Sequence, residues 1–181
     1  MRSSIFLISI LLLLMLQSCQ SSLTDYATQW TENIKQKIIE DASEQPDNKI
    51  LDSSRHSLTF FKGNKKLKLY LLMPILDKNS KVVSYDTTAS IFFSSDQNFE
   101  LVRELCLNID RSFEGVRYKG NHIGLSLFNY CDGHVKEKEF RYNNITVGTS
   151  TEYDEKGNVT KKVDNGNISM LKNLYDIKYY R

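Results

Sequence analysis

The chain reads RYKGNHIGLSLFNYCDGHVKEKEF at residues 117–140 and RYNNITVGTSTEYDEKGNVTKKVD at residues 141–164, two consecutive stretches of 24 residues. Seven of the positions that match at this offset define the register, two of them as glycine pairs and one as a conservative pair. Similarity at a fixed period indicates a repeat architecture. The residues at these seven positions are Arg117, Tyr118, Ile123, Gly124, Ser126, Gly133 and Val135 in the first stretch and Arg141, Tyr142, Val147, Gly148, Ser150, Gly157 and Val159 in the second.

Each stretch carries two turn signals, rich in Gly, Asn and Asp, between runs that suit short strands. These are Lys119-Gly120-Asn121 and Asp132-Gly133 in the first stretch, and Asn143-Asn144 and Glu155-Lys156-Gly157-Asn158 in the second. Seven of the eight glycines follow residue 100, which marks a change of composition there. We therefore predict an antiparallel β-meander of about three 24-residue hairpin repeats over residues 100–166.

The repeats resemble MORN-like repeats of bacterial proteins, which are often described as antitoxin-type repeats. The residues that carry the resemblance are Tyr153-Asp154-Glu155-Lys156-Gly157-Asn158-Val159, the preceding Val147-Gly148-Thr149, and the related run 113–120. Ser126 and Ser150 depart from the family pattern, which has an aromatic residue soon after the glycine of each unit. The resemblance implies stacked hairpins in an extended curved sheet that serves interaction rather than catalysis.

A helix and β-hairpins are predicted for residues 25–99. Asp25 is a candidate N-cap, and the helix should end near Asp41, with Tyr26, Ala27, Trp30, Ile34 and Ile38 on one stripe. We expect this stripe to pack on a core; the alternative is a helix lying on a membrane surface. Alternating apolar residues predict a hairpin over Leu58 to Met73 and a second strand pair at Lys81 to Tyr85 and Thr88 to Phe93.

The fold class is thus mainly β (α+β), with an N-terminal helix, β-hairpins and the meander. Solenoid-like arrays need capping elements at their ends. We expect residues 167–181, with Leu171, Leu174, Tyr175 and Ile177, to form the C-terminal cap.

Residues 1–18 have the features of a secretory signal: Arg2 precedes an apolar run from Ile5 to Leu16. The run ends at Leu16-Gln17-Ser18-Cys19, which resembles the lipobox of bacterial lipoproteins. This resemblance implies cleavage before Cys19, acylation of Cys19 with palmitate, and a short tether over residues 19–24. Gln20 is similar to the residue that follows the lipidated Cys in outer-membrane lipoproteins, so we expect an outer-membrane protein facing the periplasm. The alternative is an ordinary signal peptide in which Cys19 has no role.

Composition and motifs exclude several classes of function. The chain has 24 Lys and Arg against 22 Asp and Glu, spread along its length, so we expect no nucleic-acid partner. The sequence contains no HExxH, CxxC, GxSxG, Walker or dinucleotide-binding pattern. His56, His122 and His134 are scattered, and we expect no metal site, no cofactor and no enzymatic activity.

Cys106 and Cys131 are the two thiols outside the lipobox, and exported cysteines commonly pair. Their separation of 25 residues instead places them at nearly equivalent points of successive units. Such points are two strand spacings apart, roughly 9.5 Å, which is too far for a disulfide. The sequence leaves the disulfide open.

These features favour a lipid-anchored, non-catalytic module that binds an envelope protein through its repeat sheet. Tyr118, Tyr142 and Tyr153 are the candidate binding residues because aromatic side chains commonly anchor interfaces; the alternative is that they belong to the repeat core. The family resemblance suggests an immunity-like role as one option. The competing hypothesis is an envelope hydrolase with an unrecognised site, which a cleft holding a carboxylate of raised pKa would favour.

Overall fold

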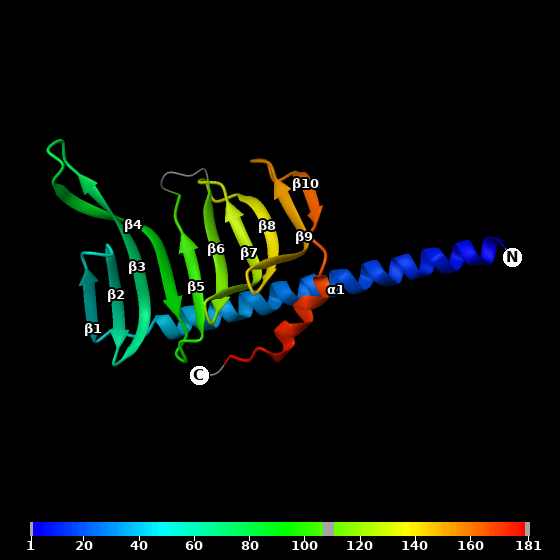
Figure 1. Ribbon diagram of the computed structural model, residues 1–181, viewed down its shortest axis with the longest axis horizontal. Coiled ribbons are helices and arrows are strands. Elements are labelled where there is room, and N and C mark those ends of the chain that lie inside the picture. Colours follow the sequence, from blue (N-terminus) through cyan, green and yellow to red (C-terminus); the bar gives the residue numbers. More distant parts are fainter. Residues whose placement is uncertain (1, 107–110, 180–181) are drawn as a thin grey trace.

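A computed structural model describes residues 2–106 and 111–179, with side chains described from residue 21 onward. It shows a mainly β protein, in which an open antiparallel sheet has its ten strands in chain order and one long helix lies against it (Figure 1). The elements are α1 (Arg2–Ala42), β1 (Asn48–Asp52), β2 (Ser57–Lys62), β3 (Lys65–Leu76), β4 (Val82–Phe93), β5 (Phe99–Glu104), β6 (Ser112–Tyr118), β7 (Asn121–Asn129), β8 (Val135–Tyr142), β9 (Ile145–Tyr153), β10 (Val159–Asp164) and the 3-10 helix η1 (Ile168–Asp176).

Helix α1 packs on the sheet through the predicted stripe. Ala27, Trp30, Ile34 and Ile38 are buried in one cluster with residues of β5 to β9, so the prediction of a core-packing helix is confirmed.

Within the described part of the chain, no helix is both long enough and apolar enough to cross a membrane.

The predicted tether over residues 19–24 is wrong, because α1 runs through this segment without a break. Leu23 is already buried, four residues before Ala27 on the same face of the helix. The prediction of Asp25 as an N-cap is wrong for the same reason: the apolar stripe begins before Asp25 and outweighs this local signal. The Cys19 side chain lies outside the described side chains.

The first predicted hairpin is confirmed, since β2 and β3 pair antiparallel around a turn at Gly63. The second strand pair, predicted at Lys81 to Tyr85 and Thr88 to Phe93, is wrong: residues 82–93 form one strand, β4. Asp86 and Thr87, which lie between the two predicted strands, pair with Met73 and Leu72 along β3. A bulge between Leu71 and Leu72 absorbs the change of register instead.

The 24-residue period appears directly in the strands. β7 and β9 begin at Asn121 and Ile145, and β8 and β10 begin at Val135 and Val159, each pair 24 residues apart. The hairpins β5–β6, β7–β8 and β9–β10 therefore form three successive units, as predicted, and the sheet continues through the β4–β5 pairing into the N-terminal strands.

Equivalent bulges in two units hold the two elements outside the sheet. In β7, residues 124–126 stand opposite one residue of β6, and the freed amide of Leu125 donates to Thr31 Oγ1 of α1 at 2.8 Å. In β9, residues 148–150 stand opposite one residue of β8, and Gly148 N donates to the carbonyl of Gly166, just before η1, at 2.6 Å. Both bulges begin with a glycine of positive φ, +72° at Gly124 and +64° at Gly148, which other residues adopt at a cost.

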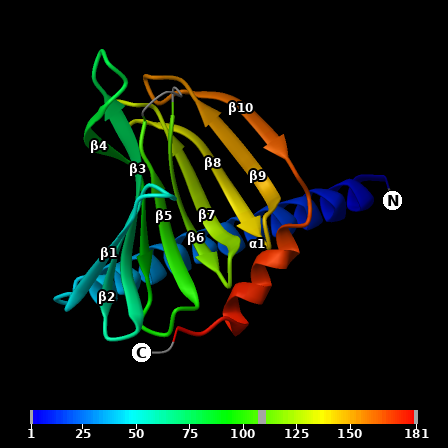
Figure 2. The ribbon, with the colours of Figure 1, turned by 60° about the vertical axis from the view of Figure 1, so that its left-hand side comes forward.

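The C-terminal segment packs along α1 and also contacts β9, so that η1 lies beside the helix (Figure 2). Leu171 and Leu174 of η1 are fully buried. The ring of Tyr175 stacks on that of Tyr26 at 3.9 Å, and the Tyr179 hydroxyl donates to Asp41 Oδ2 at 2.5 Å. The helix is thereby fixed near both ends of its contact with the sheet.

Candidate binding surfaces

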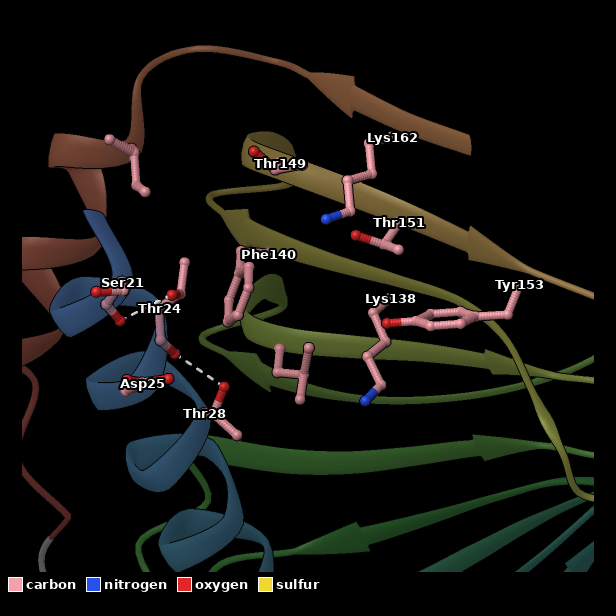
Figure 3. Close-up of a pocket in the computed structure, with 12 residues that line it drawn as sticks. Ser21, Thr24, Asp25, Thr28, Lys138, Phe140, Thr149, Thr151, Tyr153 and Lys162 are labelled. Atoms are coloured by element: carbon pink, nitrogen blue, oxygen red, sulfur yellow. Dashed lines mark hydrogen bonds between the residues drawn. The ribbon is translucent and has the colours of Figure 1, made fainter. Parts of the chain in front are cut away.

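A cavity of about 480 Å³, here called the pocket, lies between α1 and strands β7 to β10 (Figure 3). Helix α1 provides short polar side chains, the strands provide two lysines with hydroxyl and aromatic groups, and Ile168 of η1 closes one side. The lining residues are Ser21, Thr24, Asp25, Thr28, Leu125, Lys138, Phe140, Thr149, Thr151, Tyr153, Lys162 and Ile168.

Two lysines flank a threonine across three strands of the pocket. Thr151 of β9 is directly opposite Lys138 of β8 and directly opposite Lys162 of β10. Residues directly opposite in adjacent strands point to the same side of the sheet. All three side chains therefore project into the pocket, as Figure 3 shows.

The acidic side chains of the same strands belong to the next row, on the other side of the sheet. Glu137 of β8 is opposite Glu152 of β9, and Lys161 of β10 bonds Glu152 Oε1 at 2.9 Å. Burial, with added repulsion from Glu139 and Glu152, raises the pKa of Glu137. Neither Lys138 nor Lys162 makes an ion pair with a described residue; Lys138 Nζ instead lies 5.7 Å from the centre of the Tyr153 ring.

A second surface is the end of the β3–β4 hairpin, residues 73–87, here called the arm. β2 pairs with β3 only up to Leu71, and β5 pairs with β4 only from Ala89 onward, so the arm is a two-stranded ribbon. It projects from the sheet in Figure 1. Its exposed apolar residues are Leu76, Val82, Val83 and Tyr85, with 53%, 48%, 62% and 42% of their surface accessible.

No protein-family model, no curated protein and no solved structure matches this chain. The similarity to MORN-like repeats therefore stays a resemblance, carried by the residues of the two repeat units. The chemistry of the pocket and of the arm is the remaining guide to what each surface binds.

The three predicted tyrosines occupy different environments. Tyr118 and Tyr142 are partly buried against the hydrophobic core, and the Tyr118 ring lies 4.8 Å from that of Phe99. These contacts favour the core alternative for both residues. Tyr153 lines the pocket, and its backbone carbonyl accepts a hydrogen bond from the Tyr130 hydroxyl at 2.8 Å.

Cys106 and Cys131 form a disulfide, with their Cα atoms 5.5 Å apart. The distance expected from the repeat fails because neither residue lies within a strand: Cys106 follows the end of β5 and Cys131 follows the end of β7. The intervening strand β6 begins only at Ser112. The two connections can therefore meet past its end.

The buried charges beside α1 have structural partners. Lys35 Nζ lies 2.7 Å from Glu114 Oε1, and Arg103 Nε lies 2.7 Å from Glu114 Oε2. Burial acts to raise the pKa of Glu114, but the hydrogen bond and charge of Lys35, with the charge of Arg103, outweigh it and hold that pKa below its usual value. Among the described residues, no group of three or more His, Cys, Asp or Glu side chains is placed to hold a metal ion.

The sequence does contain a signal for the lysine row. Glu114, Lys138 and Lys162 follow one another at intervals of 24 residues, so they occupy one equivalent position in three successive units, on β6, β8 and β10. The extension of this position to Glu114 is easily overlooked because glutamate carries the opposite charge to the two lysines. The pairing with Thr151 places Lys138 and Lys162 on one side of the sheet, and the pocket lining shows that this side faces α1.

Proposed function

We propose that this protein is a lipid-anchored, non-catalytic binding module of the cell envelope, placed in the outer membrane and facing the periplasm, whose partner is another envelope protein. The observation that carries the binding role is the arm. It exposes four large apolar side chains on a ribbon with which no other described strand pairs. Contiguous exposed apolar surface marks interaction sites in soluble domains.

The arm suits a protein partner better than the repeat tyrosines do. Tyr118 and Tyr142 pack against the core, so they have limited surface to offer. An isolated two-stranded ribbon is only marginally stable in water. A partner that covers Val83 and Tyr85 would stabilise the ribbon and remove apolar surface from water. Pro74 within the arm lacks a backbone donor, which disfavours indiscriminate strand pairing.

Anchoring rests on the sequence of the N-terminus. The apolar run and the lipobox-like Leu16-Gln17-Ser18 precede Cys19 directly. Labelled palmitate should enter the wild-type protein and not the Cys19→Ser variant. Equal labelling of both proteins, or release of the wild type as soluble protein, would contradict the anchor.

Site-specific photo-crosslinking in cells tests the partner. A photoreactive amino acid at Val83 should yield one discrete crosslinked envelope protein. The matched control carries the photoreactive amino acid in place of Lys156, on the exposed β9–β10 turn, and should yield no crosslinked product. No product at Val83, or the same products from both positions, would refute the arm as the binding surface. A toxin is the partner class that the MORN-like resemblance suggests.

A second function, an envelope hydrolase, is favoured by one observation. Glu137, whose pKa is raised by burial and by neighbouring Glu139 and Glu152, lines a cavity of about 300 Å³ together with Glu152. A carboxyl of raised pKa with a second carboxyl close by is an arrangement that general acid–base hydrolysis uses. Turnover of peptidoglycan that is abolished by Glu137→Gln, and unaffected by Glu155→Gln on the adjacent turn, would establish this function over the binding module.

A further inference from the structure

We infer that the pocket between α1 and β8–β10 binds a small organic phosphate, held by Lys138, Lys162 and Thr151. This inference is independent of the arm and of its protein partner. It rests on the placement of the two lysines, on the repeat position that they share, and on the apolar wall beside them.

The first observation is the separation of charge between the two sides of the sheet. Lys161, on the side away from α1, is paired with Glu152. Lys138 and Lys162, on the pocket side, flank an uncharged threonine. Like charges on nearby cross-strand positions repel one another. A dianion bound between them would remove this repulsion.

The second observation is the equivalent position in the preceding unit. There the residue is Glu114, and its charge is met by Lys35 of α1 and by Arg103. In the following two units the position carries Lys138 and Lys162, and α1 offers mainly hydroxyl side chains, with Asp25 as its one acidic residue in the pocket lining. In the first unit the charge at this position is therefore neutralised within the protein. In the next two units the lysine charges are available to an external anion.

The third observation is the geometry of the row. The two lysine Cα atoms are two strand spacings apart, roughly 9.5 Å. Their long side chains can converge on a single group above Thr151. A phosphate monoester carries nearly two negative charges and several acceptor oxygens, so it can take both ammonium groups and the hydroxyl together. A monocarboxylate has one charge and fewer oxygens.

The remainder of the ligand would lie on the apolar part of the lining. Leu125, Phe140 and Ile168 form that part, on the α1 side of the lysine row. A volume of about 480 Å³ is within the range of small-molecule sites. An organic phosphate combines the charged group that the lysines require with a moiety that this wall can cover.

Calorimetric titration of the full chain in detergent tests the inference, with phenyl phosphate, glycerol 3-phosphate and benzoate as probes. Phenyl phosphate should bind saturably, and Lys138→Ala and Lys162→Ala should each weaken its binding by about tenfold or more, because each variant removes one charged hydrogen bond to the phosphate. Lys161→Ala, one residue along β10 but on the other side of the sheet, is the matched control and should change affinity less than about twofold. Lys138→Arg should retain most of the affinity, and all variants should melt like the wild type.

The two phosphates distinguish the source of the ligand. Tighter binding of phenyl phosphate indicates a soluble phosphate with an apolar moiety, whereas tighter binding of glycerol 3-phosphate indicates a glycerolipid headgroup; both support the phosphate site. Three outcomes would overturn it: no saturable binding of either phosphate, benzoate binding as tightly as phenyl phosphate, or an equal loss in Lys161→Ala.

Discussion

Gly124→Ala should destabilise the protein far more than the same change at a turn glycine. Gly124 has φ +72°, and a Cβ there would collide with the Thr31 hydroxyl and lie 3.3 Å from the Trp30 ring. The left-handed conformation costs an alanine about 1–2 kcal/mol. Overpacking against α1 adds about 1–3 kcal/mol. Displacing Thr31 also leaves the buried amide of Leu125 without its acceptor, which costs about 1–3 kcal/mol.

These contributions predict a loss of roughly 3–6 kcal/mol, because some of them relax together. Gly148→Ala should cost less, about 2–3 kcal/mol, because its Cβ would meet only the flexible Ile168 side chain, at 3.3 Å. Gly157→Ala is the control: φ is +80° and nothing lies within 4 Å, so only the conformational cost of about 1 kcal/mol remains.

Urea unfolding of the three variants measures this order directly. Equal losses for Gly124→Ala and Gly157→Ala would show that close docking of α1 on the bulge contributes nothing, and would refute the reasoning. A loss for Gly148→Ala as large as that for Gly124→Ala would show that η1 is held as rigidly as α1.

Stability should decrease as the pH falls from about 6.5 toward 4, because burial and two neighbouring arginines lower the pKa of His122 to about 4 and only the unfolded chain takes up its proton. Urea unfolding across this range should show a shallower decrease for His122→Gln, and an identical slope would contradict the shift. Tyr118→Ala should lower the free energy of unfolding by about 2 kcal/mol, because the ring packs against Phe99; an unchanged melting curve would assign the ring to the surface. Replacing Cys106 and Cys131 together with alanine should lower the free energy of unfolding by about 3 kcal/mol, because the disulfide no longer closes a loop of 25 residues in the unfolded chain. Unfolding of the wild type with and without reductant would measure the same difference.

The repeat makes the meander predictable because its signals are local. Turn residues such as Gly120 and Asn144 adopt positive φ as their types allow, and the spacing of 24 residues then fixes the order of the strands. The register of β4 with β3, in contrast, depends on two strands at once. Asp86 has the character of a turn residue, and only its pairing with Met73 shows that it lies within a strand.

The two surfaces are harder to predict, for a related reason. In a sequence, a lysine on a strand indicates only a solvent-exposed position. The pairing with Thr151 is needed to show that Lys138 and Lys162 share one side of the sheet. The disulfide depends on where β6 begins, which no pattern in the sequence indicates. The length of the arm depends likewise on where β2 and β5 stop pairing.

The docking of α1 on the bulge of β7 has a consequence for the order in which the chain acquires its structure. Strands of the sheet pair with their sequence neighbours, so each hairpin can close as soon as it is synthesised. Helix α1 is synthesised first, but two of its hydrogen-bond partners follow much later in the chain. The amide of Leu125, which bonds Thr31, lies 94 residues further on, and the hydroxyl of Tyr179, which bonds Asp41, lies 138 residues further on. The apolar stripe of the helix therefore stays without its packing partners until most of the sheet has been synthesised. A holding chaperone that binds this stripe would protect the nascent chain during the interval in which it is most prone to aggregate.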